Sequence, residues 1–258
     1  MKTITPKEIK EQSLIIPGSK SITHRMLICA ALCQGVSNIH NVLESEDTKY
    51  TMSALSCMGA GISPIVGVES ISTPGISPIK NGICQIKGFG DRPQPYAQDI
   101  YLGNSGTSMR LLAGVAALGA RQYCLTGDSR MCLRPMKALI DALKLLGIHA
   151  EGCDKKGNPP VCICGGSRQG GPISLDCSTS SQYLSSLLMI GPFMENGLEI
   201  QLQGPPVSSP YIDLTLDVMK KFKVEAHRIK ADYYRVSPKQ KYHPGTFSVE
   251  PDLSNAGY

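Results

Sequence analysis

Tryptophan is absent from this 258-residue sequence, and aromatic residues make up only 5% of it. Long runs of lysine and arginine are absent as well, and the formal net charge is a mild +5. A surface that binds nucleic acid combines clustered cations for the phosphates with aromatic side chains for the bases. These shortages argue against a nucleic-acid partner and favour small anionic molecules.

Long apolar stretches are also missing. No apolar run approaches the roughly 20 residues that a membrane-spanning helix needs, and the N-terminal MKTITPKEIK lacks the apolar core of a secretory signal. We therefore expect a cytoplasmic protein without a membrane partner. The ten cysteines include no C-x-x-C pair, so small buried thiols are favoured over a metal site or a disulfide framework.

The glycine motifs of nucleotide-binding proteins do not occur either. A P-loop has a glycine immediately before its lysine and another about six positions before it. Ser19 and Leu14 occupy those positions relative to Lys20, so the stretch GSKS is not a P-loop. The G-x-G-x-x-G fingerprint of dinucleotide-binding folds is absent too.

Three stretches of the sequence share one pattern. They read GSKSITHRMLICAAL from Gly18, GNSGTSMRLLAGVAAL from Gly103 and DCSTSSQYLSSLLMI from Asp176. Each begins with a turn rich in glycine, serine or threonine and continues as an apolar helix. The residues seven positions after the three openings are Arg25, Arg110 and Tyr183. This similarity indicates an internal repeat.

A second helical element follows in each copy, at residues 51–62, 135–151 and 213–227. Strand-like pieces surround these helices, namely SLIIPG, CQIKGF, QYCLTG, VCICGG and LEIQLQG. The pattern predicts an α/β domain in which a βαβ-type unit occurs three times. One serine-rich helix start is typical of simple capping. Three of them around a pseudo-threefold axis would instead place unpaired N–H groups and positive dipole ends on one anion-binding face.

Five motifs carry a resemblance to a known family. In chain order they are PGSKSITHR, LGNSGTSMR, TGDSRMCLRPM, STSSQYLSSLLM and VSSPYIDLTLDVM. Together they closely resemble the 5-enolpyruvylshikimate-3-phosphate (EPSP) synthase family, and the resemblance covers nearly the whole chain. Its known fold implies an inside-out α/β barrel, with buried helices around the pseudo-threefold axis and sheets outside.

Two alternatives remain beside this family. UDP-N-acetylglucosamine enolpyruvyl transferases have asparagine after the lysine, where this chain has Ser21. Their reactive cysteine lies in a glycine-rich loop several residues before an Arg-Pro pair, whereas Cys132 lies only two residues before Arg134. The other alternative is a non-catalytic anion-binding module derived from the fold, against which the presence of Lys20 and Arg134 argues.

The resemblance implies transfer of the enolpyruvyl group of phosphoenolpyruvate to the 5-hydroxyl of shikimate 3-phosphate, with release of phosphate. No metal or organic cofactor is expected, and the full-length enzyme is expected to be monomeric. Both substrates carry a phosphate and a carboxylate, which suit arginine forks, a lysine point charge and hydroxyl donors. No acid lies near Lys20 or Arg25 in the sequence, so we expect the substrates to be their partners.

The resemblance also assigns roles to individual residues. Lys20 matches a lysine that contacts both substrates and is a candidate for proton transfer. The residues that match shikimate 3-phosphate binding are Lys20, Ser21, Arg25, Ser180, Ser181, Gln182, Ser208 and Tyr211. Those that match phosphoenolpyruvate binding are Lys20, Gly106, Arg134 and Gln182.

The same resemblance implies a domain division. Residues 13–246 correspond to the N-terminal domain of the family, residues 1–12 to a segment of a second domain, and residues 247–258 to the start of the crossover into it. That second domain would supply an aspartate and a glutamate for proton transfer. We therefore expect this chain alone to bind shikimate 3-phosphate and to be inactive.

Overall fold

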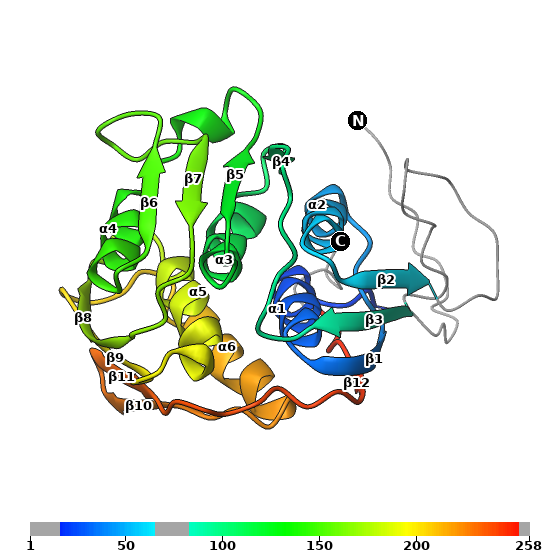
Figure 1. Ribbon diagram of the computed structural model, residues 1–258. Coiled ribbons are helices and arrows are strands. Elements are labelled where there is room, and N and C mark those ends of the chain that lie inside the picture. The colour runs from blue at the N-terminus through cyan, green and yellow to red at the C-terminus, as the bar shows by residue number, and fades with distance from the viewer. Residues whose placement is uncertain (1–15, 65–82, 253–258) are drawn as a thin grey trace, which may run out of the picture.

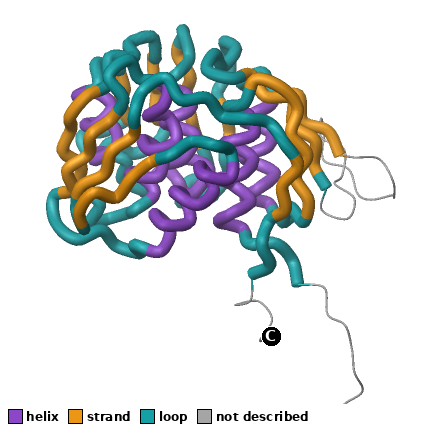
Figure 2. The backbone as a smooth tube through the Cα atoms, turned by 90° about the horizontal axis from the view of Figure 1, so that it is seen from below, coloured by secondary structure: helices purple, strands orange, loops and turns teal. Residues whose placement is uncertain are grey.

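The computed structural model describes residues 16–64 and 83–252. In this part of the chain, three four-stranded sheets surround a group of helices (Figure 1). Figure 2 shows the helices in the interior and the strands at the periphery. The predicted α/β fold with buried helices and outer sheets is therefore confirmed.

The three sheets share one topology. In each, one edge strand lies parallel to its neighbour, and the remaining pairs are antiparallel. In spatial order, the first sheet contains β12 (Thr246–Ser248), β1 (Gln34–His40), β3 (Cys84–Phe89) and β2 (Gly61–Pro64). The second contains β4 (Ile100–Tyr101), β5 (Gln122–Thr126), β7 (Val161–Cys164) and β6 (His149–Gly152). The third contains β8 (Gly171–Leu175), β9 (Leu198–Leu202), β11 (Tyr233–Val236) and β10 (Ala226–Lys230).

The first sheet takes its parallel edge strand from the far end of the described chain. β12 lies beside β1 with Asn38 opposite Thr246, in the position that β4 holds beside β5 and β8 holds beside β9. An isolated bridge also joins Gly18 to Pro251. The first repeat is thus completed by residues more than 200 positions away, and the two ends of the described chain lie side by side.

Each sheet is accompanied by two helices of different burial. The buried helices are α1 (Lys20–Ala31), α3 (Gly106–Ala117) and α5 (Gln182–Ile190). The half-buried helices are α2 (Glu46–Cys57), α4 (Lys137–Leu145) and α6 (Pro210–Lys221). Two 3₁₀ turns accompany them, η2 (Met131–Leu133) and η3 (Gly191–Phe193). The difference follows from sequence: α4 buries Leu139 and Leu143 on one face and exposes Lys137 and Lys144, whereas the buried helices are apolar around most of their circumference.

Two of the predicted second helices were too long. α4 ends at Leu145 because Gly147 adopts a φ of +77° that terminates the helix. Residues His149–Gly152 form β6 instead. α6 similarly ends at Lys221, before Lys223 with a φ of +65°. Turn geometry, rather than the amphipathic pattern, sets both ends.

Two further predicted elements differ at their starts. α2 spans Glu46–Cys57 rather than the predicted range 51–62. It begins five residues earlier because Ser45 and Thr48 form a capping box, and residues 61–62 belong to β2. For the strand predicted from SLIIPG, residues 13–15 lie outside the described range, and the rest contributes only the Gly18 bridge. Residues 1–12, assigned by the resemblance to a second domain, and residues 253–258 of the predicted crossover also lie outside the described residues.

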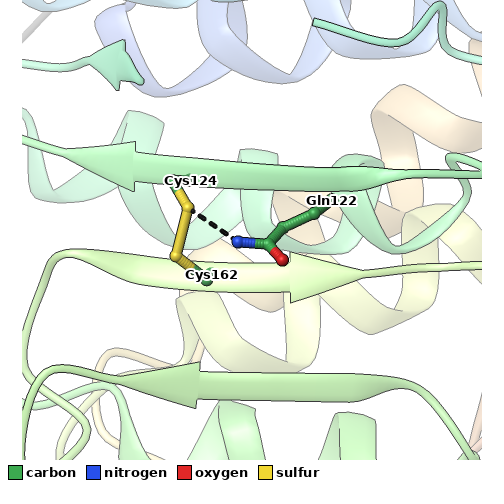
Figure 3. Close-up of a disulfide and its surroundings, with 3 residues drawn as sticks. All are labelled: Gln122, Cys124 and Cys162. Carbon is green, nitrogen blue, oxygen red and sulfur yellow. Dashed lines mark hydrogen bonds between the residues drawn. A yellow bond between two sulfur atoms is a disulfide. The ribbon is translucent and has the colours of Figure 1, made fainter. Parts of the chain in front are cut away.

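The expectation of small buried thiols was wrong for one disulfide pair and for four free thiols that are not buried, Cys57, Cys132, Cys153 and Cys164. Cys124 of β5 and Cys162 of β7 form a disulfide (Figure 3) because the antiparallel register places them directly opposite each other. The cysteines that are buried free thiols, as expected, are Cys29, Cys33, Cys84 and Cys177. Register between strands is not visible in cysteine spacing, which explains the error at the disulfide pair.

The described residues contain neither a membrane-spanning helix nor a metal-binding cluster. They contain no helix with the length and apolar character to cross a membrane. They also contain no group of three or more histidine, cysteine, aspartate or glutamate side chains arranged to hold a metal ion.

Candidate functional site

The first turns of several helices meet on one side of the helical core. Ser108 of α3 donates from Oγ to the backbone oxygen of Asp47 in α2, at 3.1 Å. Gln182 at the start of α5 donates from Nε2 to Thr107 Oγ1 in α3, at 2.9 Å. Positive helix ends are therefore gathered, as the anion-binding prediction requires.

Lys20 begins α1 on this side of the molecule. Its Nζ lies 2.9 Å from Asp47 Oδ2, and the two side chains are 49% and 31% exposed. The sequence suggested no acidic partner for Lys20, and the fold supplies one from 27 positions away. Because the pair is largely exposed, it leaves the ammonium group accessible to an anionic ligand.

Arg25 lies one turn further along α1 and is only 1% exposed. Its Nε donates to Thr215 Oγ1 at 2.7 Å, and Nη1 donates to the Ser21 carbonyl at 2.9 Å. Nη2 donates to Ser185 Oγ at 3.2 Å and to the Tyr211 carbonyl at 3.1 Å. Among the described residues no carboxylate pairs with it, and burial lowers its pKa to about 10. A guanidinium has five N–H donors, so these four hydrogen bonds leave one N–H without a partner among the described residues.

Gly106 and Arg134 lie in contact beside the start of α3. A Cβ atom added to Gly106 would lie 2.6 Å from Arg134 Nη1 and 3.4 Å from Arg110 Nη1. Arg134 also donates from Nη2 to Asn104 Oδ1 at 2.8 Å. Only glycine leaves room for the guanidinium here, so two cations and a helix N-terminus converge on one small region.

Gln182 connects this region to α5. Its Oε1 accepts from Arg110 Nη1 at 3.0 Å, while its Nε2 donates to Thr107. Arg110 also lies over the ring of Tyr183, 5.6 Å from its centre, and its buried Nε has no hydrogen-bond partner among the described residues. Sequence reasoning left Arg110 out of the candidate site, although it holds the same place in its repeat as Arg25.

The predicted serines gather around the start of α5. Ser180 is 7% exposed, and its Oγ accepts the Gln182 backbone N–H at 3.2 Å. Ser181 is 3% exposed and donates to the Ser208 carbonyl at 3.4 Å. Ser208 is exposed with a φ of +53°. Tyr211 differs, because its side chain is 43% exposed and its backbone oxygen, rather than its ring, holds Arg25.

A buried polar chain beneath Lys20 was not predicted. His24 Nδ1 lies 2.8 Å from Thr51 Oγ1, which lies 2.7 Å from Ser108 Oγ, which in turn lies 2.6 Å from Ser105 Oγ. Burial lowers the pKa of His24 to about 3, so the imidazole is neutral. The chain joins α1, α2 and α3, and its only sequence signal is the set of polar residues inside otherwise apolar helices.

Known proteins are similar to this chain in sequence and in fold. The family model for EPSP synthase (3-phosphoshikimate 1-carboxyvinyltransferase) matches residues 5–258. A protein of that name from Yersinia pseudotuberculosis is 35% identical, and one from Pectobacterium carotovorum is 37% identical, each over 99% of this chain and 57% of its own length. A solved EPSP synthase from Acinetobacter baumannii superposes with a TM-score of 0.79 at 29% identity, covering 94% of this chain and 50% of that one.

This chain therefore spans just over half the length of the curated relatives that it matches. The family match nevertheless extends over nearly all of its residues. It agrees with the repeat topology and with the motifs at the helix starts. The chain belongs to the EPSP synthase family.

Proposed function

We propose that these residues form one half of the active site of a 3-phosphoshikimate 1-carboxyvinyltransferase of the shikimate pathway, an enzyme of chorismate and aromatic amino-acid biosynthesis. The observation that carries the proposal is the contact between Gly106 and Arg134 at the start of α3. It places an arginine fork at the N-terminus of a helix, which suits a small molecule carrying both a carboxylate and a phosphate. Lys20 and Arg25 extend the positive region toward α1 and α6.

In this proposal, shikimate 3-phosphate lies between α1, α5 and the start of α6. Ser21 and the remaining N–H of Arg25 hold its carboxylate, and Gln182 and Tyr211 line the ring. The hydroxyl groups that surround its phosphate are those of Ser180, Ser181 and Ser208. The link between Ser181 and the Ser208 carbonyl supports this grouping.

Phosphoenolpyruvate then lies beside Gly106, with Arg134 on its carboxylate and Gln182 between the two substrates. The addition step requires a proton on the methylene carbon and loss of the proton of the 5-hydroxyl. Lys20 reaches both substrates in this arrangement, stabilises their charges and is a candidate for one of these transfers. Its exposed pairing with Asp47 is weak enough to be exchanged for a substrate oxygen.

The chain alone is proposed to bind shikimate 3-phosphate without completing the reaction. The aspartate and glutamate needed for proton transfer would come from a second domain. Residues 1–12 would belong to that domain, and the segment 247–258 would begin the crossover into it, where β12 completes the first sheet. The side-by-side placement of Gly18 and Pro251 supports this division, since two crossing segments would leave the domain together. A cytoplasmic monomer acting on small molecules, without nucleic acid, completes the proposal.

The proposal is tested by calorimetry of this chain with shikimate 3-phosphate. We expect saturable binding that is lost in Arg25→Met and kept in Lys230→Gln, an exposed lysine on β10. Phosphate release should appear only after the remaining half of a full-length relative is added. Binding of UDP-N-acetylglucosamine instead would assign the chain to the sister enzymes, and absence of binding and of complemented activity would contradict the proposal.

A further inference from the structure

The Cys124–Cys162 disulfide lies on the outer face of the second sheet. On β5, Tyr123 and Leu125 on either side of Cys124 are buried, whereas Cys124 itself is partly exposed. On β7, Cys162 is likewise partly exposed. Gln122 donates from Nε2 to Cys124 Sγ at 3.2 Å, on the same outward face (Figure 3). A dissolved thiol can therefore approach this bond.

The strand that carries Cys124 leads directly to the Gly106–Arg134 region. Thr126, two residues further along β5, accepts at its carbonyl the Leu102 N–H at 2.8 Å. Asp128 then donates its N–H to the Gly103 carbonyl at 3.0 Å. The next residue, Asn104, accepts the hydrogen bond from Arg134. An unbroken series of bonds thus connects the disulfide-bearing strand to both sides of that region.

The four buried free thiols are poor competitors for exchange. Burial raises the pKa of the Cys33, Cys84 and Cys177 thiols to about 12. Burial also raises the pKa of Cys29, which lies on α1 four residues before Cys33. Thiolate is the reactive form, so redox chemistry at neutral pH is directed away from the core.

We propose that Cys124–Cys162 is a reducible clamp that sets the rigidity of the loops holding Gly106 and Arg134. A low-molecular-weight thiol such as glutathione supplies the reductant. Its thiolate attacks one sulfur to give a mixed disulfide, and a second thiol releases the small-molecule disulfide. Two thiols are oxidised, and Cys124 and Cys162 are each left as a thiol.

We expect this disulfide to be reduced and re-formed because the protein is proposed to work in the reducing cytoplasm. Disulfides in reducing compartments are usually transient and redox-sensing rather than permanent. Reduction removes the covalent link between β5 and β7 and leaves their backbone ladder, so the segments downstream of Cys124 open more often. The inference rests on the proposed function for the reducing compartment and for the identity of the affected ligand, phosphoenolpyruvate.

Hydrogen–deuterium exchange of the ligand-free chain tests the clamp independently of any substrate. We expect dithiothreitol to increase exchange roughly tenfold in peptides covering residues 99–106 and 122–136. Exchange in β9 and β11 of the third sheet should not change. Alkylation and peptide mass spectrometry of the unreduced protein should recover Cys124 joined to Cys162.

Matched serine variants complete the test. Cys124→Ser should exchange like the reduced protein and should not respond to dithiothreitol. Cys153→Ser, which removes an exposed free thiol of the same sheet region, should keep the full response. Equal exchange before and after reduction, or a response that persists in Cys124→Ser, would overturn the clamp. Failure of phosphoenolpyruvate binding with the redox response intact would contradict only the proposed function.

Discussion

Arg25 and Arg134 hold their guanidinium groups in contrasting ways. Arg25 is 1% exposed and bonded to atoms of α1, α5 and α6. Arg134 is partly exposed and precedes α4 in a loop. Among the described residues its side chain has one hydrogen bond, to Asn104. The region around Arg25 is therefore set by the helical core before any ligand arrives, whereas the region around Arg134 is adjustable.

The hydrogen bonds around Arg25 show how much the folded core depends on its guanidinium group. The acceptors around Arg25 also bond one another: Ser185 and Thr215 hydroxyls lie 2.8 Å apart, and Thr215 donates to the Tyr211 carbonyl at 2.8 Å. The core would remain satisfied without the guanidinium. Removal of this buried cation, which has no carboxylate partner among the described residues, should therefore change the unfolding free energy little.

The largest effect is expected for Arg25→Met. The variant should lose roughly 3 kcal/mol of shikimate 3-phosphate binding, or more than a hundredfold in affinity, because a charged hydrogen bond to the carboxylate disappears. Its unfolding free energy should stay within about 1 kcal/mol of the parent, since lost hydrogen bonds are offset by the removed desolvation cost. Calorimetry and urea unfolding measure the two quantities. A loss of several kcal/mol in stability with binding retained would show that Arg25 serves the core.

The Gly106→Ala variant tests the adjustable region around Arg134. The added Cβ would lie 2.6 Å from Arg134 Nη1, so the guanidinium must move away from the backbone. We expect phosphoenolpyruvate binding to the chain saturated with shikimate 3-phosphate to weaken roughly tenfold or more, that is, by at least about 1.4 kcal/mol. Shikimate 3-phosphate affinity and the urea midpoint should change little, because only a flexible side chain is displaced. Equal weakening of both ligands would mean that the two regions are not separate.

His24 is buried on α1, the helix that carries Arg25, and it should make the unfolding free energy depend on pH. Its folded pKa is about 3, below the usual 6.5, so the unfolded chain takes up a proton that the folded chain refuses. The unfolding free energy should therefore fall as the pH drops from about 6.5 toward 3, by at most roughly 1.4 kcal/mol per pH unit.

The matched variants for this test are His24→Asn and His227→Gln. Asparagine can keep the bond to Thr51 without the titration, so it should flatten the pH dependence of the urea midpoint. His227 is 55% exposed, and its replacement should leave the slope unchanged. An unchanged slope in His24→Asn would place the acid sensitivity elsewhere.

Local features of the sequence were enough to locate the helix starts of the site. The turns before Lys20, Gly106 and Gln182 contain the serine and glycine residues that begin α1, α3 and α5. Seven-residue offsets within the repeats also singled out Arg25 and Arg110, although only Arg25 was assigned to the candidate site. Helix ends were less accessible, since Gly147 terminates α4 through backbone conformation while the apolar pattern continues past it.

Partners across the fold could not be inferred from the sequence. Arg25 and Thr215 are 190 positions apart, and Lys20 and Asp47 are 27 apart. Their contacts depend on how α1 packs against α6 and α2. The disulfide similarly depends on strand register. Residue types at a helix start therefore indicate which kind of ligand a site suits. The partners that these side chains have without a ligand are set by tertiary packing.

The smallest effect on stability is expected for Lys20→Gln. Lys20 and Asp47 are 49% and 31% exposed, and exposed ion pairs contribute about 0–1 kcal/mol. Urea unfolding should thus resemble that of Lys137→Gln, which removes a comparable exposed pair with Asp141. Shikimate 3-phosphate binding should weaken in Lys20→Gln and not in Lys137→Gln. If Lys20→Gln instead unfolds several kcal/mol more easily, the pair with Asp47 holds α1 against α2, and Lys20 serves the fold as Arg25 is expected not to.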